Sequence, residues 1–580
     1  MYKNYPLLFL FQFICLASYA QTTYLPLNTE ENLLLDRLET KSGRLSDSLF
    51  LTIKPVMSNH AVDFLLHQRD SVADNNLSAI DRYNISQMIS ENGEWTKDGN
   101  GAIDSKHSWF NTFYKKQYDF IIVKKGDFFV VVNPIISGIV YKEPNSPDAG
   151  NKNKLLFSSA RGAEIRGWIS KKISFYTSAT DNQERDVSFV NHWIKYYNAM
   201  PGADYYIGKS TGNYDYLQAT GYIDFAVVKD HINATFGYDK NFIGDGLTST
   251  FLSDFSSGTP FIRLNTRIWK INYENLYLEL TPQQNNIGPT SLGTLGGDHV
   301  LGHKYFSMQH LSMNLTRWLN VGLFCAVVFD RNNSYEIRYL NPVIFLAEME
   351  QSLGSGDKKH IGINFKTIAA RHLQFYGQFH LDEFTAKNFF SHNGYWANKW
   401  ALQLGGKYFD AFSVKNLDLQ LEVNATRPYT FTHYDTAATP NYSNYNQPLA
   451  NPLGADFVEV LGILRYQPVK KLFLTVKGMY YIQGVDTGSS DYGSNIFLSY
   501  NQRSADYGIK LINGVKTNCA LLNFNISYEL ARNLFIDIGA THRRYVYKEG
   551  VFNGPWPAET TTYFYSGIRL NIARRDLDFY

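Results

Sequence analysis

The stretch that decides the fold runs from Lys415 to Thr426 and reads KNLDLQLEVNAT. Its first two residues form a polar corner, and from position 417 onward apolar residues alternate strictly with Asp, Gln, Glu, Asn or Thr. Because neighbouring side chains on a strand point to opposite faces, one face of this segment is wholly apolar and the other wholly polar. The stretch therefore predicts a short turn that leads into an amphipathic β-strand.

The same sequence pattern recurs through the second half of the chain. A basic or polar corner leads into an alternating stretch at Arg317–Leu323, Arg371–Tyr376, Lys470–Val476 and Arg532–Ile538. The copies lie roughly 45–60 residues apart, which is enough for two strands and one long loop. Short turns at one end and long loops at the other are typical of a membrane barrel, so we predict an antiparallel transmembrane β-barrel of about 16–18 strands. A soluble β-sandwich or jelly roll, which alternates in the same way, is the alternative.

Composition agrees with a barrel and excludes other classes. The chain has 580 residues and a formal net charge of +2, so it lacks the strongly basic character of nucleic-acid-binding proteins. Aromatic residues make up 16% of the chain, with 41 Tyr and 40 Phe, and barrels use such residues in girdles at both membrane interfaces. Mean hydropathy is −0.29. After the first residues no run reaches the roughly 18 apolar residues of a spanning helix, so a helical membrane protein is not expected.

The two ends of the chain carry targeting patterns. Residues 1–20 read as a secretory signal peptide, with Lys3, an apolar run over Leu7–Leu16 and a small-residue cleavage site ending at Ala20. The last amphipathic strand, Tyr563–Ile572, precedes an aromatic end and resembles the signal read by outer-membrane barrel assembly machinery. We therefore expect the protein in a bacterial outer membrane.

Between the signal peptide and the barrel, the sequence predicts three short amphipathic helices over Thr29–Arg44, Ser58–Arg69 and Leu77–Glu91. Helices of this length are marginal alone, so they must pack together or against the barrel mouth. We predict a helical module over residues 21–110 and a barrel over 111–580. The module is expected in the periplasm, on the side of the short turns. It is either a structural plug or a docking site for a periplasmic partner.

A long polar loop over Gly237–Thr259 is the main candidate site. The charged residues of this loop and of the strand after it are Asp239, Lys240, Asp245, Asp254, Arg263 and Arg267. Trp269 is predicted on the same strand face as the two arginines. That face should line the lumen, because arginine at the bilayer midplane costs about 2–4 kcal/mol. Two interpretations stay open: a lumen plug held by Asp–Arg pairs, or a binding site for carbohydrate or an anionic polymer.

A second candidate lies in an expected outer loop, Pro440–Pro448. Tyr442 and Tyr445 could offer rigid stacking faces to an extracellular polymer, whereas Tyr434, nearest the strand, is expected in the aromatic girdle. Cys325 and Cys519 both fall in expected strands, where they could pair or remain free thiols. The chain shows no nucleophile, base and orienter in one frame and no ligand set at a recognised metal spacing. We therefore expect no enzymatic activity, no metal and no cofactor.

Four segments together resemble the Wzi-type capsule-assembly family, in its Bacteroidetes branch, some of whose members are RemB-like gliding-motility proteins. They are NYDYLQATGYI (213–223), FGYDKNFIGDG (236–246), FLSD (251–254) and RLNTRIWK (263–270). The resemblance covers nearly all of the mature chain and is most specific in this central block. One departure is Leu247-Thr248-Ser249, which stands where the family pattern has Tyr-Arg-Ser.

The resemblance implies an outer-membrane barrel of about 18 strands with a periplasmic helical bundle, and a lectin-like role in holding surface polysaccharide. We therefore expect a non-enzymatic protein that assembles or retains capsule. Its expected partners are surface polysaccharide and outer-membrane lipid, and a periplasmic or outer-membrane protein is a further candidate. The alternatives are an accessory component of gliding motility or protein secretion, and a solute channel.

Overall fold

The computed structural model describes most of the chain. The described residues are 22–70, 76–97, 99–151, 154–170, 172–209, 212–283, 302–331, 334–343, 346–353, 356–383, 386–434, 440–487, 490–547 and 557–578. The signal peptide expected over 1–20 and the aromatic end Phe579-Tyr580 lie outside these residues.

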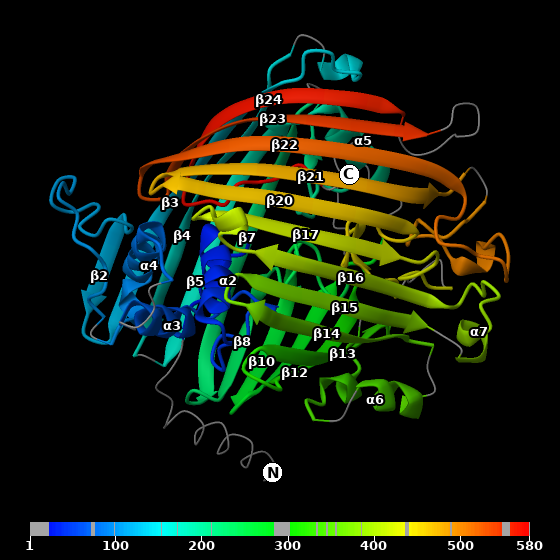
Figure 1. The fold of residues 1–580 in the computed structure, drawn as a ribbon, viewed down its shortest axis with the longest axis horizontal. Helices are drawn as coiled ribbons and strands as arrows, with labels where there is room; N and C mark the ends of the chain where they lie inside the picture. The colour runs from blue at the N-terminus through cyan, green and yellow to red at the C-terminus, as the bar shows by residue number, and fades with distance from the viewer. Residues whose placement is uncertain are drawn as a thin grey trace, which may run out of the picture.

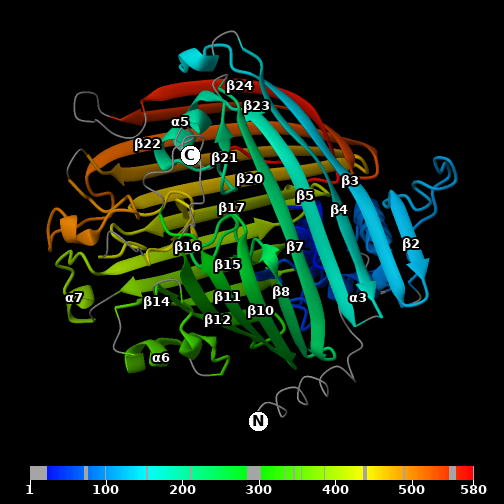
Figure 2. The same ribbon diagram turned by 180° about the vertical axis from the view of Figure 1, so that it is seen from behind.

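Eighteen antiparallel strands close into a barrel, which confirms the predicted fold class (Figures 1 and 2). The barrel closes where β24 pairs with β3, from Phe564 opposite Lys142 to Leu570 opposite Ile136. The wall strands are β3 (Phe128–Lys142), β4 (Leu156–Ile169), β5 (Ile173–Arg185), β7 (Tyr214–Val228), β8 (Ile232–Asp239), β10 (Thr259–Ile268), β11 (Ile271–Leu280), β12 (Lys304–Asn314), β13 (Leu319–Phe329), β14 (Lys358–Ala370), β15 (Leu373–Glu383), β16 (Lys399–Tyr408), β17 (Leu417–Thr426), β20 (Phe457–Val469), β21 (Leu472–Val485), β22 (Val515–Ala531), β23 (Leu534–Tyr547) and β24 (Glu559–Leu570).

Six short strands lie beside or inside this wall. β2 (Ile121–Lys125) extends the wall beside the first half of β3, and β6 (Ile207–Gly208) pairs with β7. The remaining four form two small sheets: β1 (Ile53–Lys54) pairs with β9 (Phe242–Ile243), and β18 (Ser443–Asn444) pairs with β19 (Gln447–Pro448). The first wall strand thus begins at Phe128, after the boundary expected near residue 111.

Strand β17 shows why alternation predicts the wall. Leu421 and Val423 point outward and keep 53% and 46% of their surface exposed, as lipid-facing residues do in a structure without lipid. The residues that alternate with them, Glu422 and Asn424, are each 1% exposed and face the interior. The polar face of the sequence pattern is therefore the inner face of the barrel.

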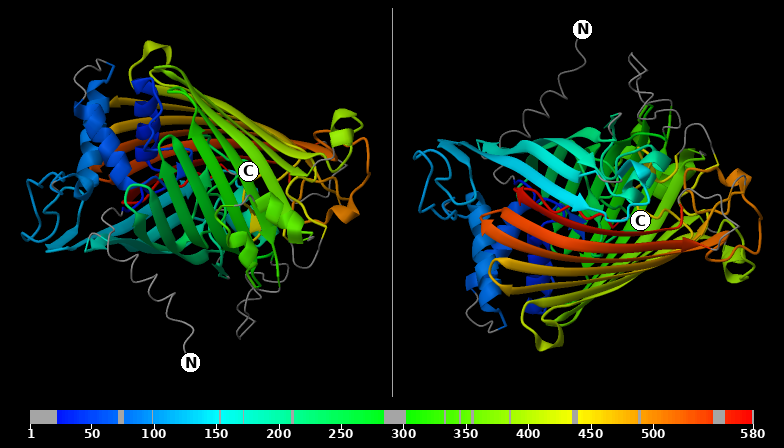
Figure 3. Two further views of the ribbon diagram at one scale, coloured as in Figure 1. Left: turned by 90° about the horizontal axis from the view of Figure 1, so that it is seen from below. Right: turned by 90° about the horizontal axis from the view of Figure 1, so that it is seen from above.

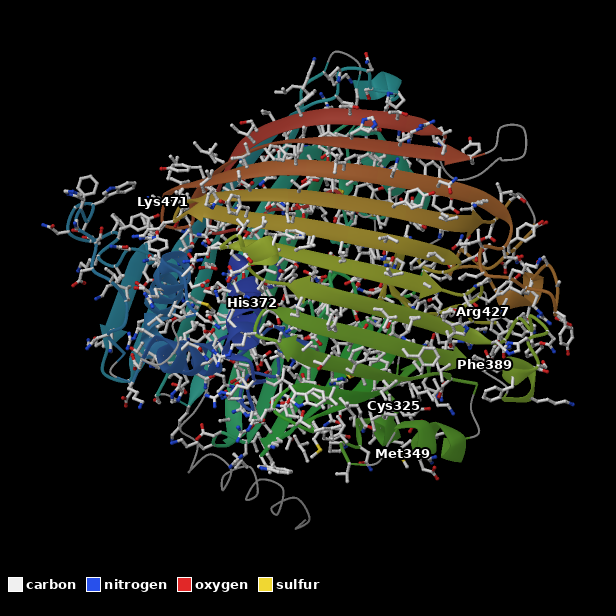
Figure 4. The ribbon with its side chains drawn as sticks, in the orientation of Figure 1. Cys325, Met349, His372, Phe389, Arg427 and Lys471 are labelled. Carbon is white, nitrogen blue, oxygen red and sulfur yellow. The ribbon has the colours of Figure 1, made fainter. Side chains whose placement is uncertain are left out.

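The connections differ at the two ends of the barrel. One end has short turns, such as Lys470-Lys471 and Arg532-Asn533, where Asn533 takes the left-handed conformation (φ 57°) that asparagine tolerates. The other end carries the long loops. Figure 4 places His372 and Lys471 at the short-turn end, and Phe389 and Arg427 at the long-loop end.

Three helices, α2 (Glu30–Ser42), α3 (Ser58–Asp70) and α4 (Ala79–Glu91), gather at the short-turn end (Figures 1 and 3). Helix α4 starts with a capping box between Ser78 and Asp81, and α2 ends at Gly43 with φ 73°. The inward-facing residues of the three helices, among them Leu35, Leu38, Leu65 and Ile85, form a core with the segment 49–56. The helices therefore form a packed module against the barrel mouth.

The other helices lie on the long loops: α5 (Ser188–Tyr197), α6 (Leu346–Leu353) and α7 (Ala386–Phe390). Five single turns of 3-10 helix complete the described structure: η1 (Gly93–Trp95), η2 (Ala149–Asn151), η3 (Ile337–Leu340), η4 (Ala411–Ser413) and η5 (Tyr500–Gln502). None of the helices in the described part of the chain has both the length and the apolar character needed to cross a membrane. Cys325 on β13 and Cys519 on β22 are both buried, and no disulfide joins them.

Cysteine labelling tests the orientation of the barrel in the membrane. We expect Tyr507→Cys, at an exposed position of a long loop, to react with a membrane-impermeant maleimide on intact cells. Lys415→Cys, at an exposed short turn, should react only after the outer membrane is permeabilised. The two native cysteines are buried, so the unsubstituted protein serves as the background control. The reverse labelling pattern would invert the assigned orientation.

Candidate functional site: a filled lumen and an outer aromatic row

The β8–β10 connection, residues 240–258, lies inside the barrel. Its strand β9 pairs with β1 of the N-terminal segment, and the amide of Gly244 donates a hydrogen bond of 2.7 Å to the carbonyl of Thr52. Further along the loop, Phe251 and Leu252 belong to a buried cluster with wall residues that include Phe306 and Phe324. Two segments distant in sequence therefore fill the same part of the lumen.

Polar side chains of the wall hold this loop. The Glu422 carboxylate accepts hydrogen bonds from the amides of Leu247 (2.7 Å) and Thr248 (3.2 Å) and from the Thr248 hydroxyl (2.7 Å). On β15, the Gln378 side chain accepts from the Thr250 amide (2.8 Å) and donates to the carbonyl of Ile243 (2.9 Å). A tight turn of backbone is thus clamped between β15 and β17.

The four charged residues expected in this loop contact the N-terminal segment, the wall or one another. Asp245 accepts from the Thr52 hydroxyl at 2.8 Å and lies 3.3 Å from the Lys366 ammonium. Asp254 accepts from the Asn28 side chain at 2.5 Å. The Lys240 ammonium donates to the carbonyl of Asp254 at 3.1 Å, and the Asp239 carboxylate accepts from the Lys240 amide at 2.7 Å.

The expected Asp–Arg pairing between this loop and β10 is wrong. Arg263 is buried and pairs with Glu274 on the neighbouring strand at 2.8 Å, while its other nitrogen donates to Asn241. Arg267 donates to the carbonyl of Ser48 at 2.5 Å and contacts the His60 ring at 2.7 Å. The inward position of both arginines follows from the alternation of β10, but their partners are Glu274 of β11, Asn241 of the inward loop, and Ser48 and His60 of the N-terminal part, and none of them is an aspartate of the loop.

Trp269 also departs from the prediction. It lies in the turn after β10 with φ 54° and 69% of its surface exposed, and the Lys270 ammonium is 5.4 Å from its ring. Strand β10 ends at Ile268, so the alternation that places Arg263 and Arg267 inside does not extend to Trp269. It therefore forms no aromatic platform in the lumen.

The β17–β20 connection folds inward as well, which corrects the expected outer position of Tyr442 and Tyr445. Tyr442 is completely buried, stacks on Phe431 with ring centroids 5.2 Å apart, and donates its hydroxyl hydrogen to the carbonyl of Phe251. Tyr445 is 5% exposed and packs in a cluster with Trp193 of α5. Neither ring offers an open face, because the hairpin β18–β19 packs on the inward loop 240–258.

A third inward segment follows β24. Residues 571–578 turn back into the barrel, where Arg575 pairs with Glu184, Lys477 pairs with Asp578, and Leu577 is buried beside Tyr563. The sequence gave no signal that the residues after the last strand occupy the lumen. Loops from one end and chain segments from the other therefore meet inside the wall.

Helix α2 is fixed to the wall by buried ion pairs. Asp36 lies 2.6 Å from the Lys407 ammonium and 3.2 Å from that of Lys366, and Glu39 lies 2.8 Å from Lys366. Burial by itself raises the pKa of Asp36, but Lys407 and Lys366 outweigh it and hold that pKa well below its usual range. The sequence shows these lysines on polar strand faces, and no local pattern connects them with α2.

A second group of ion pairs joins α2 to the β16–β17 turn. Arg37 pairs with Asp81 at 2.7 Å, with Asp410 at 2.5 Å and with Asp418. Lys41 pairs with Asp81 at 2.8 Å and with Asp410 at 2.7 Å. Burial raises the pKa of Asp410, yet Arg37 and Lys41 lower it overall to about 2. The helical module is therefore docked electrostatically at the mouth.

The barrel interior also holds a histidine pair that the sequence analysis did not single out. The ring nitrogens of His360 and His380 are 3.0 Å apart, and His380 lies 2.5 Å from the carbonyl of Thr250 on the inward loop. Both residues occupy inward positions of β14 and β15, so the alternation of these strands could have identified them. They contact Phe431 and Tyr442 and contribute to the packed interior.

At the long-loop end, aromatic side chains from three loops form a continuous outer aromatic row. It consists of Tyr507, Tyr395, Trp396, Tyr500 and Tyr434. Successive ring centroids in that order are 5.3, 6.0, 4.7 and 6.3 Å apart. The two ends of the row are open, since Tyr507 is 56% and Tyr434 is 46% exposed. Only Tyr434 was named from the sequence, because the row is assembled from segments distant in the chain.

Charged groups border the outer aromatic row, and each is paired. The Arg503 guanidinium lies 4.4 Å from the Trp396 ring and 2.6 Å from Asp506. The Lys399 ammonium lies 4.0 Å from the Tyr500 ring and 2.8 Å from Glu383. The row thus combines flat apolar faces with hydrogen-bonding groups and no large excess of one charge.

These features define an 18-stranded outer-membrane barrel whose lumen is filled by its own chain. The solved structure of Wzi from Escherichia coli, described as an outer-membrane protein involved in group 1 capsule assembly and a carbohydrate-binding β-barrel, has a similar fold. The two chains are 10% identical with a TM-score of 0.55, and the match covers 96% of this chain and 100% of Wzi.

Two porins align over a smaller part of the chain. OprD of Pseudomonas aeruginosa gives a TM-score of 0.40 at 10% identity, covering 76% of this chain and 94% of OprD. A BenF-like porin of Pseudomonas fluorescens gives 0.40 at 8% identity, covering 76% and 97%. No family model and no curated protein matches the sequence. The fold is therefore Wzi-like, and the comparison carries no further assignment.

Acid should release helix α2 from the wall. The depressed pKa values of Asp36 and Asp410 mean that their ion pairs contribute full stability above about pH 4, the unfolded-state pKa of aspartate. That contribution is lost as the pH falls toward 2. We expect cleavage of residues 30–42 by pepsin, normalised to a reference peptide, to rise steeply across this window. Asp104→Asn, which removes an exposed ion pair with Lys116, is the matched control and should not shift the curve. A normalised rate that does not depend on pH would contradict the electrostatic docking.

Conductance should report the state of the lumen. The unsubstituted barrel in a planar lipid bilayer should be closed or nearly so. Glu422→Ala leaves buried donors of residues 247–248 unpaired, at about 1–3 kcal/mol for each, and should raise the frequency of open events. Asp104→Asn, which removes an exposed ion pair with Lys116 away from the wall, should behave like the unsubstituted protein. A large steady conductance before any substitution would favour a channel.

Proposed function

We propose that the protein is a non-enzymatic outer-membrane barrel that assembles or retains extracellular polysaccharide at the cell surface. The observation that carries this proposal is the filled lumen: wall residues such as Glu422 and Gln378 are saturated by the chain's own backbone. A barrel whose lumen is filled by its own loops offers its binding surface at the outer loops. A solute channel would need the same groups to face water.

The outer aromatic row is the best site for such a polymer. Sugar rings have apolar faces that stack on aromatic side chains, and rigid Tyr and Trp residues supply such surfaces at small entropic cost. Tyr507 and Tyr434 are the most exposed members, and Arg503 adds hydrogen-bond donors beside the Trp396 ring, whereas the Lys399 ammonium is buried beneath Tyr500. Since both cations are ion-paired, the site suits a neutral or weakly charged glycan better than a highly anionic one.

The Wzi-like fold supports the same proposal, because Wzi is described as carbohydrate binding. The sequence resemblance to RemB-like proteins raises a second role, in gliding motility or secretion, for which a partner protein would be needed. The two roles differ in what cells lose without the protein, and one deletion strain can separate them.

The test is retention of surface polysaccharide, together with motility, in cells that lack the protein. We expect the deletion to release polysaccharide into the medium. The double variant Tyr434→Ala, Tyr507→Ala should do so in part at normal barrel abundance, whereas Tyr434→Phe, Tyr507→Phe should retain it, because the stacking faces remain. Phe412→Ala, at an exposed position of the short-turn end, is the matched control. Normal retention with lost motility in the deletion strain would replace the polysaccharide role with the motility role.

A further inference from the structure

Residues 103–117, between η1 and β2, form a projection that we call the aromatic finger. Its two antiparallel segments are joined by isolated β-bridges, one between Asp104 and Lys116 and one between Trp109 and Phe113. The amide of Trp109 donates to the carbonyl of Phe113 at 2.9 Å, so the tip is a closed turn. In Figures 1 and 3 this segment extends beyond helices α3 and α4 at the short-turn end, away from the barrel interior.

The tip of the finger exposes its largest apolar side chains. Trp109 is 61% exposed and Phe110 is 91% exposed. Behind them, Phe113 stacks on Phe120 with centroids 4.6 Å apart, and Tyr114 contacts both Trp109 and Phe120 at 5.5 and 5.3 Å. This aromatic base supports the tip, from which Phe110 projects almost fully exposed, while Trp109 keeps more than half of its surface open.

The finger begins where the lipid-facing surface of the wall ends. Phe120 leads directly into β2, whose residue Val123 is exposed on the outer side and pairs with Val130 of β3. Next to it, Phe128 and Ile169 are opposite one another in the register and are both exposed. The apolar band of the wall therefore continues to the short-turn edge beside the finger.

Exposed basic residues outnumber exposed acidic ones on the finger, on β2 and on the turn after it, where the exposed carboxylates are Asp104 and Asp127. Exposed basic residues lie on the finger and on the adjoining β2, namely Lys106, His107, Lys115, Lys124 and Lys125. The Asp104 carboxylate of the finger is paired with Lys116 at 2.8 Å. Exposed Trp and Phe side chains flanked by lysines are the composition of segments that lie in the headgroup region of anionic membranes.

We propose that the aromatic finger binds the surface of the inner leaflet of the outer membrane, with Trp109 and Phe110 in the headgroup region of anionic phospholipids. Two independent features point to lipid: the continuity of the finger with the apolar band of β2–β3, and the charge complementarity between its lysines and phosphate groups. The finger then acts as a lateral support that fixes the height and tilt of the short-turn end in the membrane.

The test uses the whole barrel with an environment-sensitive fluorophore on Phe110→Cys, reconstituted in vesicles. One set contains phosphatidylcholine alone, and the other contains phosphatidylcholine with phosphatidylglycerol. We expect a blue-shifted emission in the anionic vesicles, with quenching by lipids that carry a shallow spin label and protection from iodide. The ratio of shielded to exposed fluorophore should fall about fivefold for each of Lys106→Gln and Lys115→Gln, since a lysine near an anionic surface contributes about that factor. Tyr507→Cys, at the long-loop end, is the control position and should remain open to iodide.

Three results would overturn the proposal. The fluorophore at position 110 could stay in water in both kinds of vesicle, or it could insert equally after both lysines are replaced. It could also become shielded only when a periplasmic protein fraction is added, which would assign the finger to a protein partner. Barrel folding is checked for every variant by its heat-modifiable mobility on gels, and the substituted side chains are exposed.

Discussion

The structure depends on one requirement: the polar inner face of a wide barrel must have partners. Strand alternation that presents Leu421 and Val423 to lipid necessarily turns Glu422 and Asn424 inward. In a porin, water meets that requirement. Here the backbone of residues 243–250, helix α2 and the segment after β24 meet it instead. The inward loops and the docked helices both follow from the use of protein instead of water as the partner of this face.

The sequence predicts the wall well, because the period of two is local and is repeated in every strand. The corner at Lys415, the outward Leu421 and the start of α4 at Ser78 each follow from a few neighbouring residues. What could not be predicted depends on partners far away in the chain. Arg267 was correctly placed inside, but its contacts with Ser48 and His60 join segments that no local pattern connects.

The same difference between local pattern and distant partners explains why Tyr442 and Tyr445 were expected at the outer surface but are buried. Tyr442 and Tyr445 lie in a polar, Asn-rich loop, which by composition belongs on an outer surface. The loop is polar because it hydrogen-bonds to other loops inside the barrel, as Asn444 does with the Ser257 hydroxyl at 2.8 Å. Composition reports that a loop needs hydrogen-bond partners, and it does not report whether water or protein supplies them. The outer aromatic row could not be predicted from the sequence, because Tyr395, Tyr434 and Tyr507 come from three separate loops that only the fold brings together.

The pairing of β24 with β3 closes the barrel around segments from both ends of the chain. Tyr24 and Arg575 contact the inner face of the wall at Tyr222 and Glu184, and β1 is hydrogen-bonded to β9. The pairing of Phe564 with Lys142 closes the wall around these segments. Both ends of the chain therefore support the wall from inside, and loss of either set of contacts would leave buried polar groups of the wall without partners.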